Sequence, residues 1–131
     1  MILAMDTSAL MAPVETGVRL FEELERVVGS YEAVVPEAVE AELARLADGE
    51  GEPARAAAVG TDLAARCATV ETDATYADDA LVELANTGRT DGVVTNDATL
   101  RERVLAAGIQ VIHLRGRTQL ARTQPCTNES G

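Results

Sequence analysis

The sequence predicts an α/β fold in which a central parallel sheet of about five strands is covered by helices on both faces. Short apolar runs alternate with amphipathic segments along the chain, and turn residues close each run. The links between these segments are short, which favours helical crossovers between parallel strands. A dinucleotide-binding fold would share this rhythm, but no glycine-rich turn follows the first apolar run.

Five apolar runs are short enough to be buried strands of a parallel sheet. These expected strands span residues 1–5, 33–35, 68–70, 93–94 and 109–114. Between them, apolar residues recur at helical spacing, and glycine or polar turns end each pattern. These expected helices span residues 18–28, 36–47, 54–66, 78–86 and 98–107. Pro13 is expected to interrupt any helix that begins after the first strand.

The length of 131 residues fits one domain, which we place at residues 1–116. Residues 117–131 are polar and lack periodicity, so we expect a mobile tail there. No signal-like segment precedes Asp6, and no apolar run approaches the roughly 20 residues of a membrane span. The sequence therefore predicts a soluble, cytoplasmic protein that does not contact a membrane.

The chain is strongly acidic, with a formal net charge of −11 and no lysine. Together with the high alanine content, this composition is typical of proteins adapted to strong salt, where ions screen the excess carboxylates. The simpler alternative is an acidic protein that repels polyanions. Cys67 and Cys126 form no motif, so no structural disulfide is expected and a reducing compartment fits.

Acidic residues follow two of the expected strands directly. Asp6 comes after the first strand, and Asp97 ends the polar step after the strand at 93–94. Because ligands of open α/β sheets bind at the carboxyl ends of the strands, both aspartates are candidates for a site. Two helices add further acids: Glu42 lies close to the apolar face of its helix, and the pair Asp78 and Asp79 begins another.

Crowded carboxylates repel one another unless a cation joins them. A set of oxygen ligands without histidine or cysteine suits Mg²⁺ or Mn²⁺, and either ion can activate water for phosphodiester cleavage. Some of these acids could instead merely cap helices, and this alternative applies to Asp78, Asp79 and Asp97. The single histidine, His113, lies in an expected strand, where a hydrogen-bonded structural role is favoured over catalysis and a histidine-pair ribonuclease mechanism is excluded.

Four stretches together resemble a PIN domain, and they cover almost the whole chain up to Leu114. In order they read MDTSAL, VPEAVEAEL, YADDALVELA and VVTNDATLRERVLAAGIQVIHL. The similarity is greatest to archaeal members that resemble VapC-type toxins and to PIN nucleases that process ribosomal RNA. The resemblance implies a three-layer α/β/α ribonuclease that uses one or two Mg²⁺ or Mn²⁺ ions, often as a homodimer. A toxin would also bind an antitoxin protein.

The acidic positions of the family correspond to Asp6, Glu42, the aspartate at the helix start and Asp97. The helical phase favours Asp78 for the third position, whereas the spacing to Asp97 in toxin-like members favours Asp79, and both remain candidates. The resemblance also places three polar residues beside the ligands. They are Thr7, Thr95 and Asn96.

An RNA substrate must find local positive charge on this acidic chain. The candidates for phosphate contacts are Arg101, Arg115 and Arg117, followed by Arg89 and Arg103. Any one of these arginines could be no more than a solvated surface residue. A member of another class, a PIN-like module that binds or assembles without catalysis, would keep the fold and the acids but not the turnover.

Overall fold

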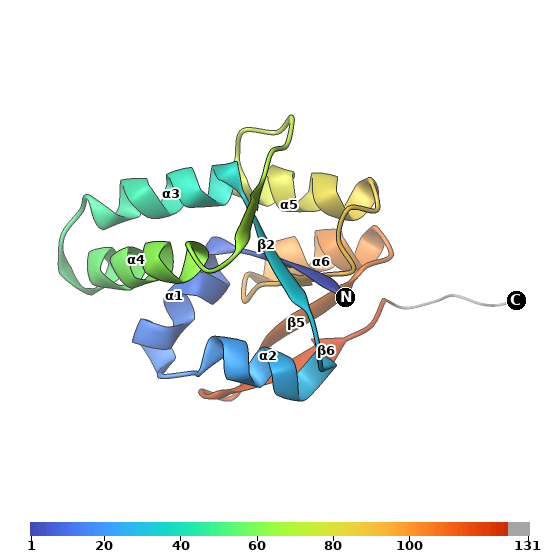
Figure 1. The fold of residues 1–131 in the computed structure, drawn as a ribbon, viewed down its shortest axis with the longest axis horizontal. Helices are drawn as coiled ribbons and strands as arrows, with labels where there is room; N and C mark the ends of the chain where they lie inside the picture. Colours follow the sequence, from blue (N-terminus) through green and yellow to red (C-terminus); the bar gives the residue numbers. More distant parts are fainter. Residues whose placement is uncertain (126–131) are drawn as a thin grey trace, which may run out of the picture.

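The computed structural model describes residues 1–125, which form a six-stranded sheet between layers of helices (Figure 1). The strands in chain order are β1 (Ile2–Met5), β2 (Glu32–Pro36), β3 (Ala68–Val70), β4 (Gly92–Val94), β5 (Gln110–Arg115) and β6 (Gln119–Thr123). Their order across the sheet is β3-β2-β1-β4-β5-β6, and only β6 is antiparallel to its neighbour. The α/β/α fold expected from the sequence is confirmed, with one strand more than expected.

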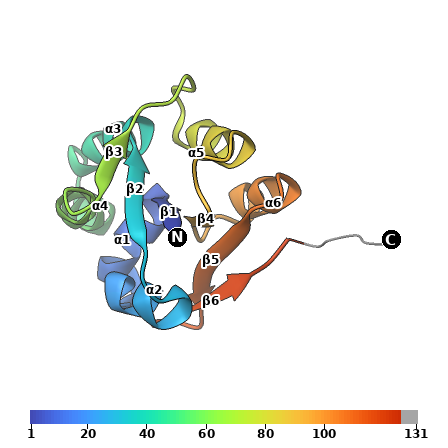
Figure 2. The same cartoon turned by 45° about the vertical axis from the view of Figure 1, so that its right-hand side comes forward.

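Six helices connect and cover these strands. They are α1 (Thr7–Thr16), α2 (Leu20–Val28), α3 (Glu37–Ala47), α4 (Gly51–Ala64), α5 (Ala77–Asn86) and α6 (Ala98–Ala106). Helices α5 and α6 lie side by side on one face of the sheet, while α1 and α4 lie on the other (Figure 2). Within residues 1–125, no helix is both long enough and apolar enough to cross a bilayer.

The core consists mainly of aliphatic side chains from the inner strands and from the facing sides of the helices. Leu3, Met5, Val93 and Ile112 are fully buried in the sheet. The strands β1 and β4 are neighbours with Met5 opposite Val94, so their carboxyl ends meet at one edge of the sheet. This parallel pairing positions the residues that follow each strand next to one another.

Helix α1 corrects one expectation, because it continues through Pro13. The proline removes one backbone donor, but α1 buries Ala9, Leu10 and Ala12 against the rest of the core, and this burial outweighs the lost hydrogen bond. The helix ends at Gly17, whose positive φ of 82° suits glycine. An uninterrupted α1 places Thr7, the residue that begins it, on the same face as residues one and two turns later.

Helix α4 packs closely against α1 and α3 because its buried residues are small. At Gly60, an added Cβ would lie 3.0 Å from Leu43 Cδ2 and 3.1 Å from the Leu10 carbonyl oxygen. Leu10 belongs to α1, so its backbone cannot easily move aside. Glycine is therefore the residue that permits this distance between α4 and α1.

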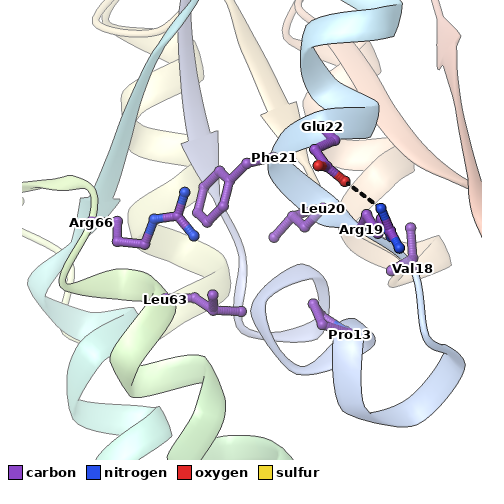
Figure 3. Close-up of a pocket in the computed structure, with 8 residues that line it drawn as sticks. All are labelled: Pro13, Val18, Arg19, Leu20, Phe21, Glu22, Leu63 and Arg66. Atoms are coloured by element: carbon purple, nitrogen blue, oxygen red, sulfur yellow. Dashed lines mark ion pairs between the residues drawn. The ribbon is translucent and has the colours of Figure 1, made fainter.

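The corner between α1, α2 and α4 contains a surface hollow of about 260 Å³. Phe21 and Leu63 line it, and the Arg66 guanidinium lies 4.3 Å from the centre of the Phe21 ring (Figure 3). The arginine thus covers the aromatic face with its planar cation. None of the acids predicted for the site lines this hollow.

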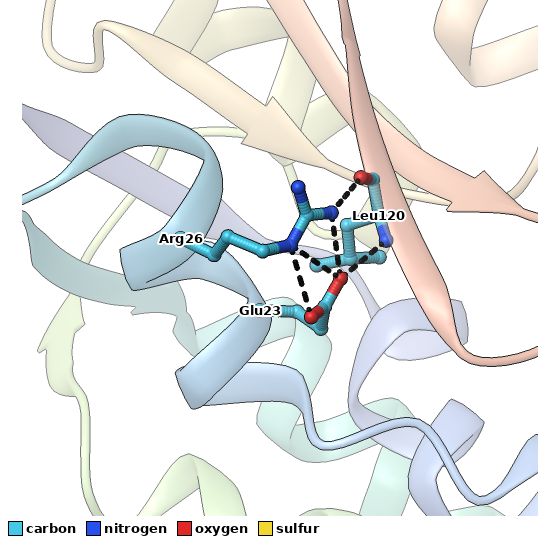
Figure 4. A network of polar contacts seen from close by, with 3 residues as sticks. All are labelled: Glu23, Arg26 and Leu120. Atoms are coloured by element: carbon cyan, nitrogen blue, oxygen red, sulfur yellow. Dashed lines mark hydrogen bonds and ion pairs between the residues drawn. The ribbon is translucent and has the colours of Figure 1, made fainter.

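Strand β6 lies in the segment for which the sequence predicted no regular structure. Side chains of α2 hold it in place: Glu23 accepts a hydrogen bond of 2.9 Å from the Leu120 N–H, and Arg26 donates one of 2.9 Å to the Leu120 carbonyl (Figure 4). Glu23 and Arg26 also pair at 2.8 Å. The strand was not predicted because these contacts come from residues nearly a hundred positions earlier. Residues 126–131, including Cys126, lie outside the described part of the chain.

Candidate acidic site

Asp6 lies at the centre of the candidate site, immediately after β1. Its backbone N–H donates to the Val94 carbonyl at 3.0 Å, which extends the pairing between β1 and β4 by one residue. The side chain is only 3% exposed, and burial raises the pKa of its carboxyl group above the ordinary value. Hydrogen bonds from Thr95 at 2.6 Å and from Ser8 at 2.8 Å oppose this shift.

Ser8 and Thr95 fix the orientation of Asp6 by linking the two strand ends. Their hydroxyl oxygens lie 3.2 Å apart. The Ser8 oxygen accepts from the Asn96 N–H at 2.9 Å, and the Thr95 oxygen accepts from the Asp97 N–H at 3.0 Å. The short network therefore holds the start of α1 against the turn that precedes α6.

Asn96 extends the same network to the next strand. Its side-chain oxygen accepts a hydrogen bond of 2.8 Å from the Leu114 N–H near the end of β5. The residue therefore supports the turn rather than the acids directly. Both Thr95 and Asn96, which the family resemblance placed beside the ligands, contact the edge of the sheet where Asp6 lies.

Glu42 reaches the site from α3. Its Oε1 atom accepts a hydrogen bond of 2.6 Å from the Thr7 hydroxyl, and its Oε2 atom lies 3.6 Å from Arg45 one turn later. Thr7 is buried at the first position of α1. One polar residue on α1 thus orients an acid from another helix toward Asp6.

The two aspartates at the start of α5 have different surroundings. The pKa of Asp78 is raised, first by partial removal from water and then by the negative charges of Asp6, Asp97 and Glu42. Asp79 forms an ion pair of 2.9 Å with Arg103 on α6. Asp78 therefore lines the same cavity as the other acids, whereas Asp79 pairs with Arg103 beside it.

Asp97 combines a structural position with a place in the acidic group. It is the N-cap residue of α6, and its Oδ1 atom accepts a hydrogen bond of 2.9 Å from the Leu100 N–H. Its charge also contributes to the raised pKa of Asp78. The two interpretations that the sequence left open, capping and site formation, are thus compatible in one side chain.

A cavity of about 340 Å³ joins these acids. Its lining contains Asp6, Glu42, Asp78 and Asp97, and it also contains Ser8, Met11 and Glu15 from α1. Within residues 1–125, no three acidic, histidine or cysteine side chains already converge closely enough to hold a metal ion. Glu42 instead contacts Thr7 and Arg45, and Asp97 caps its own helix.

Ser8, Met11 and Glu15 were missed by the sequence analysis. Thr7, Met11 and Glu15 recur every four residues, which places them on one face of a continuous helix. This spacing is present in the sequence, but the helix break expected at Pro13 meant that the three residues were not assigned to one helix face. Glu15 adds a fifth carboxylate to the rim of the cavity.

The arginines proposed for RNA contacts lie in different settings. Arg115 is exposed at the end of β5, on the same sheet edge as Asp6, and Arg117 is exposed in the turn that follows. Arg101 is half-buried on α6. Arg103 pairs with Asp79, and Arg89 donates to the Glu71 carbonyl at 3.0 Å.

Neither His113 nor Cys67 is placed as a nucleophile or base. The His113 ring contacts Thr123 Oγ1 of the neighbouring strand at 2.8 Å and the Leu114 carbonyl at 3.1 Å, which is the structural role expected from the sequence. Burial raises the pKa of the Cys67 thiol to about 11, so the thiol remains protonated near neutral pH. The acids are therefore the chemically distinctive groups of the described chain.

The mostly parallel α/β sheet carries the buried Asp6 after β1 and Asp97 after β4, and Glu42 and Asp78 line the same cavity. A family model described as PIN like domain matches residues 3–117, and the chain belongs to this family. Among solved structures, it is similar to one described as the PIN domain endonuclease Utp24. The two share 22% sequence identity with a TM-score of 0.77, over 97% of this chain and 96% of the other. None of the curated proteins compared matches the chain.

Proposed function

We propose that this protein is a metal-dependent endoribonuclease whose acidic cavity binds Mg²⁺ or Mn²⁺. The observation that carries this proposal is the single cavity lined by Asp6, Glu42, Asp78 and Asp97 from four separate segments. Oxygen ligands without nitrogen or sulfur fit these hard cations, and a cation would relieve the repulsion that raises the pKa of Asp78. A similar fold in a protein described as a PIN domain endonuclease supports the same activity.

Each residue has a separate task in this proposal. Asp6 is oriented by Ser8 and Thr95, so it can offer a fixed oxygen with little loss of side-chain freedom. Asp78 is exposed and can adjust its position, and Asp97 is restrained by its helix cap. When bound, one or two ions would neutralise phosphate charge and lower the pKa of water.

Arg101, Arg115 and Arg117 are the residues that we assign to the RNA backbone. Replacing Arg115 and Arg117 together should weaken RNA binding and flatten its salt dependence, because fewer counterions are then released. Metal binding by this double variant should equal that of the parent. Unchanged RNA affinity would place the contact surface elsewhere.

The decisive experiment is cleavage of a labelled RNA with Mn²⁺ or Mg²⁺, with and without chelator. We expect internal cleavage that stops when the metal is removed, together with Mn²⁺ binding detected by calorimetry. Metal and RNA binding without any cleavage would favour the alternative of a silent binding or assembly module. A role as a toxin with an antitoxin partner, a role in RNA processing, and a homodimeric state rest on family resemblance and need separate tests.

A further inference from the structure

Tyr76 is an aromatic residue that the fold leaves in solvent. It is the N-cap residue of α5, and 75% of it is exposed. The chain contains three Tyr and Phe residues in total, and the other two have structural contacts: Phe21 lies under Arg66, and Tyr31 donates a hydrogen bond of 3.1 Å to the Phe21 carbonyl. Within residues 1–125, no comparable packing accounts for the ring of Tyr76.

The position of Tyr76 connects it with the acidic site. The residue lines two hollows that both include Glu42. One, of about 330 Å³, also contains Asp78 and Arg103, and the other, of about 400 Å³, contains Arg45. Tyr76 therefore lies beside Glu42, and each of the two hollows that it lines also contains an arginine.

The loop before Tyr76 is tethered to the helix that follows it. The Glu83 carboxylate accepts hydrogen bonds from the Asp73 N–H at 3.0 Å and from the Ala74 N–H at 2.9 Å. These bonds fix the backbone just before the aromatic residue. A ring presented on a restrained backbone loses less freedom when it binds a ligand.

Both arginines can turn toward a ligand at little cost. Arg45 lies 3.6 Å from Glu42 and Arg103 lies 2.9 Å from Asp79, and all four side chains are at least about one-third exposed. Surface ion pairs of this kind contribute little to stability. A phosphate bound beside the ring could therefore accept hydrogen bonds from either guanidinium group.

We propose that Tyr76 stacks on the base of an unpaired RNA nucleotide next to the cleaved bond, with Arg45 and Arg103 meeting the neighbouring phosphates. The proposal rests on the nuclease function proposed above and names the residues that would hold an unpaired nucleotide beside the acids. Bases in a duplex are already stacked on one another, whereas an unpaired base can turn onto a protein ring. Stacking depends weakly on base identity, so the site selects strandedness more than sequence.

Intrinsic fluorescence can report this contact directly, because the chain has two tyrosines and no tryptophan. In the Tyr31→Phe variant, Tyr76 is the sole source of tyrosine emission. We expect an oligoadenylate of about six nucleotides to quench this emission in buffer with Ca²⁺ in place of Mg²⁺, and a blunt RNA duplex not to quench it. In the reciprocal Tyr76→Ala variant, the emission of Tyr31 should not respond to either RNA.

Affinity and cleavage give the second measurement. Tyr76→Ala should raise the Kd for the oligoadenylate by about 5-fold to about 100-fold, as is usual for one lost base–aromatic stack, and should raise KM by a larger factor than it lowers kcat. Tyr76→Trp should bind at least as tightly as the parent. Tyr31→Phe is the matched control and should leave the Kd and KM at the values of the parent.

The outcomes separate this proposal from the nuclease assignment. If Tyr76 emission does not change while RNA is bound and cut, or if Tyr76→Ala binds as tightly as the parent, the stacking role is wrong and the nuclease function stands. Equal quenching by duplex would overturn the preference for single strands. Quenching without cleavage in Mn²⁺ would support the stacking role and refute the nuclease function, and absence of both binding and cleavage would refute both.

Discussion

The carboxylates of the site and the carboxylates that hold the fold together have opposite electrostatic surroundings. Asp6 is buried, and Asp78 is partly removed from water and faces other negative charges, so the pKa values of both are raised. Glu83 accepts backbone N–H bonds and Glu23 accepts bonds from Arg26 and a backbone N–H, so their pKa values are lowered. In a chain of net charge −11, the removal of one charge should therefore have opposite consequences in the two places.

The largest expected effect belongs to Asp97→Asn, which removes charge from the site but keeps the helix cap. We expect cleavage to be abolished, while the metal-free protein gains on the order of 1 kcal/mol from reduced repulsion. Thermal melts in EDTA, run beside a cleavage assay with Mn²⁺, measure both quantities. Asp79→Asn should retain cleavage because Arg103 already neutralises that charge. An active Asp97→Asn enzyme would contradict the assignment of the site.

The opposite result is expected for Glu23→Gln, which weakens the bridge between α2 and β6. We expect the melting temperature to fall by roughly 3 to 6 °C, because a charge-assisted contact is lost. Glu22→Gln is the matched control on the same helix. Its partner Arg19 lies 3.5 Å away and both side chains are largely exposed, so the substitution should have an effect near zero. Equal melting temperatures for both variants would show that Glu23 stabilises the fold no more than a surface carboxylate does.

A smaller effect is expected from the protonation of Glu83, which should weaken its hydrogen bonds as the pH falls. Its pKa in the folded state lies below the ordinary value of 4.5, so the unfolded chain binds a proton more readily. The stabilisation is therefore complete above that ordinary value and is lost as the pH falls through the lower folded pKa. Hydrogen exchange of the Asp73 and Ala74 amides should accelerate, relative to the intrinsic rate at each pH, as the solution is acidified. Glu83→Gln should weaken this dependence, and a variant with an unaltered pH profile would refute it.

The smallest expected effect is the dependence of the melting temperature on salt concentration. Unscreened repulsion among the carboxylates should lower the melting temperature as KCl is reduced from about 2 M to about 0.1 M. The slope should be smaller for Asp97→Asn than for the parent, because one member of the crowded group is gone. A melting temperature independent of KCl would argue against the salt-adapted interpretation of the composition.

Much of the fold was predictable because buried strands and amphipathic helices leave local patterns. Asp6 and Asp97 could be placed near the sheet edge because each follows the end of a strand. Helical phase favoured Asp78 and the spacing to Asp97 favoured Asp79, so the sequence left that choice open. Contacts distant in sequence were not predictable in the same way. Strand β6 alternates weakly, with Leu120 buried and its neighbours more exposed, and its anchors lie on α2. Its formation therefore depends on tertiary contacts more than on local preference.

Glu15 was not predicted for a different reason. Its helical spacing from Thr7 and Met11 was present in the sequence, but Pro13 predicted a break between them. Whether a helix tolerates an internal proline depends on how much surface the helix buries, which a single sequence states only indirectly. The contribution of α1 to the cavity was missed for this reason and not for lack of a pattern.

The close approach of α4 to α1 at Gly60 has a consequence for the acidic cavity. Any Cβ there presses on the Leu10 carbonyl, and Leu10 sits in the helix whose first turn carries Thr7 and Ser8. Because packed helices transmit strain rather than absorb it, the displacement would travel along α1 to the hydroxyl groups that orient Glu42 and Asp6. We therefore expect a residue without a side chain, far from the cavity in sequence, to influence the positions of Glu42 and Asp6.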